Sequence, residues 1–212
     1  IMAHRTIWSF LFFVVLLTMQ GRVPEFMQAV STRKSFAILC LASVLVGFNW
    51  LVFVYAVQTG RALESSLGYY ILPLVSVLFG VLFYRERLPY GKWLAVGIAT
   101  IAVGVLTAGF GAFPTISIVL AVTFAIYGML KKSSPIGPVV SVTAEVLMIA
   151  PLSLIWLWGV HTLGWMGLTG RNAGVFGTDW FESGLLALSG VLTAGPLILF
   201  SYASKRVELG TL

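Results

Sequence analysis

The sequence predicts an all-α integral membrane protein, a polytopic bundle of about seven transmembrane helices, from three observations. Hydrophobic residues make up 59% of the 212 residues, and charged residues make up only 9%. A soluble domain carries about 25% charged residues, so this chain has too few to build a surface that faces water. The apolar runs are continuous rather than alternating, which favours membrane helices over the strands of a membrane barrel.

The first three expected spans are stretches without charge. The first covers residues 6–20, after Arg5, and the second is the 26 uncharged residues 35–60, between Lys34 and Arg61. The third is the 20 uncharged residues 65–84, between Glu64 and Arg85. Each stretch is close to the ~20 residues that a helix needs to cross a bilayer, apart from the shorter first one.

The next four spans follow the same reasoning. The 38 uncharged residues 93–130 are too long for one span, and the segment 109–114 (Gly-Phe-Gly-Ala-Phe-Pro) divides them into a helical hairpin. The sixth span is 138–158, which contains one acid, Glu145, and the seventh is 183–204. The segment 159–182 holds six glycines with Trp165 and Trp180, and it reads as an exposed loop with aromatic anchors at the membrane interface; a short interfacial helix at Trp165 is the alternative.

Basic residues predict the orientation, because the gaps between spans must alternate between the two sides. One set of gaps holds ten basic residues and the other holds three. Cytoplasmic loops carry the excess of Lys and Arg, so the first set is predicted to be cytoplasmic and the loop 159–182 external. The ten are Arg22, Arg33, Lys34, Arg85, Arg87, Lys92, Lys131, Lys132, Lys205 and Arg206. The net charge of +6 therefore indicates topology and contact with the lipid bilayer rather than nucleic acid.

A short internal repeat links the second and seventh spans. Tyr55-Ala56 is followed by Arg61 and then by small residues and Leu, and Tyr202-Ala203 is followed by Arg206 and a similar series. Five spans separate the copies, so they would have opposite orientations, as in the inverted repeats of secondary transporters. A match this short can also arise by chance.

Several short segments form a recognisable series along the chain. They are His-Arg-Thr-Ile-Trp-Ser at 4–9, Asn-Trp at 49–50, Tyr-Ala-Val at 55–57, Glu-Ser-Ser-Leu-Gly-Tyr-Tyr at 64–70, Pro-Leu at 73–74, Glu-Arg-Leu at 86–88, Phe-Ala-Ile-Tyr-Gly at 124–128 and Pro-Leu at 196–197. Together they resemble the RarD-type branch of the EamA drug/metabolite transporter superfamily. The resemblance covers nearly the whole chain in order. Gln58 departs from the pattern, where the family would have asparagine.

The resemblance implies ten helices in two inverted repeats of five, of which this chain would hold the second to the eighth. Residues 1–110 would then be the remainder of the first EamA repeat, with four spans, and residues 111–212 part of the second, with three. It also implies a bacterial inner (plasma) membrane and transport of small molecules.

No pattern in the sequence indicates an enzyme, a cofactor or a metal site. There is no Gly-rich phosphate loop, and His4 and His161 are the only histidines. Function is therefore expected from polar groups within the bundle. Glu145 is the sharpest candidate, because a carboxylate within a span must face the interior, pair with a cation or stay protonated. It would contact substrate, couple to protons or serve as a buried structural hydrogen-bonding group.

Other substrate-pathway candidates are polar or aromatic residues of the spans. Asn49 lies mid-span, where an amide usually bonds across helices, and Trp50 beside it would offer an indole N–H. Arg5 would attract an anionic group or snorkel to the headgroups. The remaining candidates are Tyr69, Tyr70 and Tyr127, for which packing is the competing interpretation.

The sequence thus favours a secondary transporter or exporter of small metabolites or drugs that works by alternating access. Its expected partners are the lipid bilayer and a small-molecule substrate, and a homodimer is left open. A non-transporting membrane scaffold or assembly subunit and a channel are the alternatives. A scaffold would show no solute-dependent stabilisation, and a channel would show a continuous polar stripe.

Overall fold

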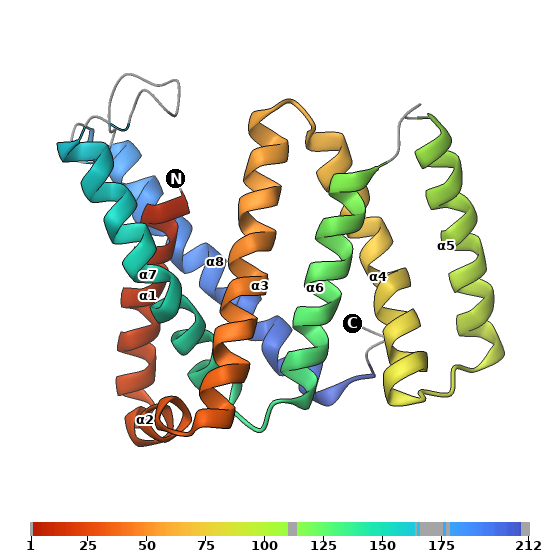
Figure 1. The fold of residues 1–212 in the computed structure, drawn as a ribbon, viewed down its shortest axis with the longest axis horizontal. Coiled ribbons are helices and arrows are strands. Elements are labelled where there is room, and N and C mark those ends of the chain that lie inside the picture. The colour runs from red at the N-terminus through yellow and green to blue at the C-terminus, as the bar shows by residue number, and fades with distance from the viewer. Residues whose placement is uncertain (1, 110–113, 164, 166–175, 177–178, 209–212) are drawn as a thin grey trace. The chain divides into compact units, whose positions relative to one another are not determined.

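The computed structural model describes residues 2–109, 114–163, 165, 176 and 179–208, and these form eight helices (Figure 1). No strand occurs within these described ranges. Seven of these eight described helices are long and apolar enough to cross a membrane. The predicted all-α polytopic bundle is therefore confirmed.

The seven apolar helices match the seven expected spans. They are α1 (Met2–Met19), α3 (Arg33–Gln58), α4 (Ala62–Tyr84), α5 (Tyr90–Gly109), α6 (Thr115–Ser133), α7 (Pro138–Thr162) and α8 (Trp180–Arg206). The helices α4, α7 and α8 each continue through a proline, at Pro73, Pro151 and Pro196. Because proline has no N–H to donate within a helix, each removes one backbone hydrogen bond from its helix.

The structure also contains a helix that the sequence analysis missed, α2 (Val23–Ser31). Its nine residues are too short to span a bilayer, and they lie between two spans, where no long apolar run predicts a helix. Pro24 in the first turn suits a helix start, Ala29 belongs to a buried apolar cluster that includes residues of α1 and α7, and Phe26 packs against this cluster. Met27 remains exposed, so α2 is amphipathic.

Two tight turns begin with a glycine in the left-handed region. Gly21, with φ +64°, follows α1, and Gly60, with φ +76°, follows α3. In the second turn the N–H of Arg61 donates to the carbonyl of Ala56 at 2.8 Å, which closes the end of α3 with a Schellman motif. Glycine is favoured at both positions because a Cβ would strain this conformation.

The chain divides into two compact units, each built from two separate stretches. Unit 1 comprises Ile1–Ser43 and Pro135–Ser201, and unit 2 comprises Val44–Ser134 and Tyr202–Leu212. These compact units do not test the predicted division into two EamA repeats at residue 110, which stays a prediction.

Unit 1 is organised around the packing of α1 on α7. Its apolar cluster of buried residues consists of Leu17, Ala29, Leu39, Ile136, Val139, Val140 and Ala144. Gly190 of α8 approaches α1 closely, since a Cβ added there would lie 2.5 Å from the Cβ of Trp8. The hydroxyl of Ser9 donates to the carbonyl of Gly190 at 2.8 Å.

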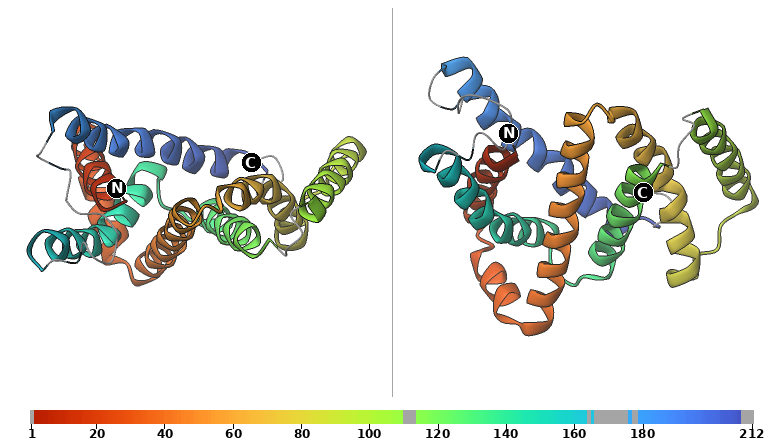
Figure 2. Two further views of the ribbon diagram at one scale, coloured as in Figure 1. Left: turned by 90° about the horizontal axis from the view of Figure 1, so that it is seen from above. Right: turned by 45° about the horizontal axis from the view of Figure 1, so that its top comes forward.

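Unit 2 is organised around the packing of α4 on α6, with α5 beside α4 (Figures 1 and 2). Ala56, Ile116 and Leu120 form its apolar cluster, with Val52 and Phe53 packed against it. None of the residues of α5 is buried, so this helix lies at the edge of unit 2. The candidate site described below lies within this unit.

The ends of the segment between α7 and α8 differ from the expectation. The helix α7 extends to Thr162 and α8 begins at Trp180, so both ends of the expected loop 159–182 are helical. Helical backbone bonds can continue past the apolar core, which is why counting apolar residues underestimates helix length. Residues 110–113 of the predicted hairpin turn and most of the segment between α7 and α8, Arg171 and Asn172 included, lie outside the described residues.

Candidate functional site

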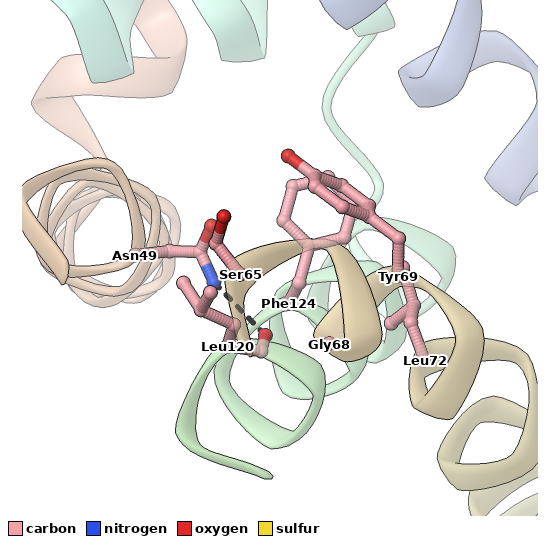
Figure 3. Close-up of a pocket in the computed structure, with 7 residues that line it drawn as sticks. All are labelled: Asn49, Ser65, Gly68, Tyr69, Leu72, Leu120 and Phe124. Carbon is pink, nitrogen blue, oxygen red and sulfur yellow. Dashed lines mark hydrogen bonds between the residues drawn. The ribbon is translucent and has the colours of Figure 1, made fainter. Parts of the chain in front are cut away.

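A pocket lies in unit 2 where α3, α4 and α6 meet (Figure 3). Its enclosed part is small, with room for about one water molecule, and it opens to the surroundings. Its lining consists of Asn49 from α3, then Ser65, Gly68, Tyr69 and Leu72 from α4, and Leu120 and Phe124 from α6. It therefore combines one buried amide and one buried hydroxyl with apolar and aromatic side chains.

The amide of Asn49 joins α3 to α6. Its Nδ2 donates to the carbonyl of Leu120 at 2.9 Å and to the Oγ1 of Thr123 at 2.8 Å. A backbone carbonyl only accepts, so the nitrogen of the amide must face α6. Both N–H groups are then engaged, and the Oδ1 of Asn49 is the atom left to meet a ligand.

The lining residues of α4 share one face of that helix. Ser65, Gly68, Tyr69 and Leu72 are spaced by three or four residues, which places them one above another. The hydroxyl of Ser65 is only 2% exposed and donates to the carbonyl of Ala62 at 2.8 Å. Because the hydroxyl hydrogen of Ser65 is already engaged, only the lone pairs of its oxygen are left to accept a hydrogen bond from a ligand.

Close packing of α4 on α6 fixes one side of the pocket. A Cβ added to Gly68 would lie 3.1 Å from the carbonyl oxygen of Ser117 and 3.2 Å from the Cβ of Leu120. In addition, the hydroxyl of Ser117 donates to the carbonyl of Glu64 at 2.6 Å. Glycine at position 68 and serine at position 117 thus let the two backbones approach each other.

Aromatic rings form the other walls. Tyr69 is 59% exposed, and its ring meets Phe53 edge to face with centroids 6.1 Å apart. Phe124 lies 5.5 Å from the ring of Tyr127, which is fully buried. Rings held by neighbouring rings offer flat apolar surfaces to a ligand.

An ion pair directly precedes the pocket residues of α4 in the sequence. Arg61 in the turn before α4 contacts both carboxylate oxygens of Glu64, at 2.6 and 2.9 Å. This hydrogen bond raises the pKa of Arg61. Glu64 is therefore oriented toward Arg61, and the residue after it, Ser65, is the one that lines the pocket.

A second polar cluster ties the end of α4 to the end of α6. Lys132 lies 2.5 Å from Glu86, and it sits over the ring of Tyr84 at 4.8 Å from its centroid. The hydroxyl of Tyr84 donates to the carbonyl of Met129 at 3.0 Å and also contacts the hydroxyl of Ser133. This cluster holds α4 and α6 together away from the pocket.

The structure brings together some of the predicted site residues and separates others. Asn49 and Tyr69 line one pocket, and Tyr127 supports its wall through Phe124. Tyr70 is 64% exposed, and neither it nor Trp50 belongs to the lining. Whether any of these residues contacts a substrate stays a prediction.

Arg5 and Glu145 lie in unit 1, on α1 and α7. Glu145 is fully buried and accepts a hydrogen bond from the hydroxyl of Ser141 at 2.7 Å. It thus occupies the interior position expected of a carboxylate within a span. Its predicted role in transport remains a prediction.

The sequence analysis missed Ser65, Gly68, Leu72, Leu120 and Phe124 as lining residues. A signal was present in the four-residue spacing of Ser65 and Tyr69 and of Leu120 and Phe124, which puts each pair on one helix face. The sequence does not predict which helix faces meet, because apolar residues surround most of each span. Among the described residues, no group of three or more His, Cys, Asp or Glu side chains could hold a metal ion.

Comparison with known proteins gives consistent matches over the whole chain. The sequence model of the EamA-like transporter family matches residues 1–108. The chain is 38% identical to Protein RarD of Salmonella typhimurium over 212 residues, covering 100% of this chain and 70% of the relative. It is 36% identical to an uncharacterized transporter of Vibrio cholerae, covering 100% of this chain and 68% of the relative.

A third relative is the uncharacterized transporter YojE of Bacillus subtilis, which is 40% identical over 99% of this chain and 68% of its own length. No solved structure matches the chain.

Proposed function

Because this chain belongs to the EamA-like transporter family, we propose that it is a secondary transporter that moves small metabolites or drugs by alternating access. It is a multi-pass membrane protein of a transporter family. The three relatives described above, from Salmonella, Vibrio and Bacillus, are bacterial. The bacterial inner membrane is accordingly its proposed location. With no ATP-binding motif in the sequence, gradients of ions or of the substrate would supply the energy.

One observation carries the proposal beyond the family, namely the pocket between α3, α4 and α6. The buried amide of Asn49 and the buried hydroxyl of Ser65 both line it, within apolar helices. Polar groups placed within spans commonly mark substrate pathways. Small-molecule sites also combine mainly apolar walls with a few fixed polar groups, as this pocket does.

The other predicted residues are proposed as substrate-pathway residues, each within its own unit. In unit 2, Tyr127 would support the pocket wall, and Trp50 and Tyr70 would contact the solute. In unit 1, Arg5 would attract an anionic group. Glu145 would couple transport to protons or contact substrate in unit 1. Prolines within α4, α7 and α8 favour helices that bend between two states of access.

The test is solute flux by the purified protein in proteoliposomes, with and without a proton gradient across the membrane. A transporter gives flux that saturates with solute concentration, and the variant Asn49→Leu lowers it. Flux that rises linearly with concentration supports a channel instead. If no solute of a broad panel crosses, and none shifts the unfolding temperature, the protein is a membrane scaffold.

A further inference from the structure

We propose that the pocket between α3, α4 and α6 recognises hydrogen-bond donors, and that its ligand is an uncharged solute whose flat apolar ring carries an N–H or O–H group. The inference rests on the proposed transport function for its biological role. The binding preference itself can be measured without transport.

Hydrogen bonds within the protein determine which donors and acceptors of the pocket remain for a ligand. Both N–H groups of Asn49 are engaged by α6, at 2.9 Å to the carbonyl of Leu120 and 2.8 Å to Thr123. The hydrogen of Ser65 is engaged by the carbonyl of Ala62 at 2.8 Å. The two buried polar side chains therefore offer acceptor oxygens to a ligand and no donor.

Two acceptors from different helices line this one pocket, Asn49 on α3 and Ser65 on α4. Figure 3 shows the nitrogen of Asn49 pointing toward the carbonyl of Leu120, which leaves the amide oxygen for a ligand. A ligand N–H or O–H entering here has the oxygens of Asn49 and Ser65 as acceptors. A ligand that presents only acceptors would leave them unpaired, which is costly for buried polar groups.

The absence of charge from the lining sets the second requirement. None of the seven described lining residues is ionisable at neutral pH, and the neighbouring Glu64 is held by Arg61 at 2.6 and 2.9 Å. An ammonium or carboxylate group on the ligand would lose water without gaining a counter-charge. The pocket therefore disfavours ions of either sign.

The aromatic walls set the third requirement. Tyr69 and Phe124 project from α4 and α6 into the same space (Figure 3). Phe53 contacts the ring of Tyr69 and Tyr127 contacts the ring of Phe124, with centroids 6.1 and 5.5 Å apart. Rings fixed in this way suit a planar apolar body, and the remaining lining residues, Leu72, Leu120 and Gly68, add no polar side chain.

The experiment measures binding of three labelled probes to the protein in nanodiscs, with empty nanodiscs subtracted to remove partition into lipid. Indole carries a ring and an N–H. In 1-methylindole the same ring lacks the N–H, and tryptamine keeps the N–H but adds an ammonium. We expect indole to bind about tenfold more tightly than either of the other two. Equal or tighter binding of 1-methylindole or tryptamine overturns the inference.

Two serine variants supply a matched pair. Ser65 and Ser66 both donate to the carbonyl of Ala62, at 2.8 and 3.0 Å, but only Ser65 lines the pocket. Ser65→Ala is expected to reduce the preference for indole over 1-methylindole at least threefold, whereas Ser66→Ala leaves it unchanged. An unchanged preference in a folded Ser65→Ala protein contradicts the role of Ser65.

The outcome separates this inference from the proposed function. If the protein prefers indole but carries no solute across proteoliposomes, the transport proposal fails and the chemistry of the pocket stands. If it transports solutes but binds the probes equally, the chemistry assigned to the pocket fails and the transport proposal stands.

Discussion

The hydroxyl of Ser9 on α1 donates to the carbonyl of Gly190 on α8 at 2.8 Å, across 181 residues of sequence. The same glycine leaves no room for a side chain, since an added Cβ would lie 2.5 Å from the Cβ of Trp8 and 2.6 Å from the backbone nitrogen of Ser9. Small residues at such crossings let membrane helices approach and gain van der Waals contact and hydrogen bonds. Unit 1 therefore depends on this pair to seat α8 against α1.

The first prediction concerns this crossing. Gly190→Ala forces the backbones of α1 and α8 apart, and it should destabilise the protein by about 1–3 kcal/mol, the usual cost of overpacking. The measurement is the unfolding temperature of the purified protein in detergent. Gly195→Ala on the same helix is the control, because nothing lies within 4 Å of its added Cβ. Equal stability of the two variants would show that α8 does not pack on α1 in this way.

The second prediction concerns the ion pair between Glu86 and Lys132, whose side chains are 9% and 20% exposed. Glu86→Gln leaves the ammonium of Lys132 without a charged partner in a poorly solvated place, so it should lower stability by about 2 kcal/mol. Denaturant titration of Glu86→Gln, Lys132→Gln and the double variant gives the coupling free energy. A coupling near zero would mean that the pair does not tie α4 to α6.

Glu25→Gln is the matched control for that experiment. Glu25 also pairs with a cation, Arg22, at 3.1 Å, but its side chain is 55% exposed. Exposed pairs contribute about 0–1 kcal/mol, so this variant should stay close to the unchanged protein.

The third prediction concerns Glu145. Glu145→Gln keeps the size of the side chain and an oxygen that can accept from Ser141, but it removes the ability to carry a proton or a negative charge. If the carboxylate couples transport to protons or contacts the substrate, flux in proteoliposomes should fall at least tenfold. The variant should still insert and elute as a single species. Glu182→Gln, at an exposed position in the first turn of α8, should transport normally. Normal flux by Glu145→Gln would remove the proposed role.

The fourth prediction concerns the turn between α3 and α4. Gly60 has φ +76° and open space around its Cα, so Gly60→Ala changes only the strain of the backbone. The left-handed conformation costs other residues about 1–2 kcal/mol, and the unfolding temperature should fall accordingly. Gly91→Ala, in the first turn of α5 with equally open space and no positive φ, should not destabilise. A neutral Gly60→Ala would indicate that this turn adopts another conformation.

The sequence alone determined the number of spans and their approximate places. Lipid makes exposed backbone and charge costly, so long uncharged runs such as 35–60 must become helices regardless of their neighbours. The same argument located Glu145 in the interior and singled out Asn49 as an amide that bonds across helices, and both expectations agree with the structure. The amphipathic helix α2 was not predicted, because its nine residues are only partly buried and form no long apolar run.

Only the tertiary structure decided which helix faces meet. Every span is apolar on most of its circumference, so periodicity cannot distinguish a lipid-facing side from a packed one. It could not show that Ser65 and Phe124 face Asn49 whereas Tyr70 is exposed, or that Gly190 contacts Trp8. The hydrophobic effect drives helices into the membrane, but contacts between particular side chains pair them there, and those contacts exist only once the helices are assembled.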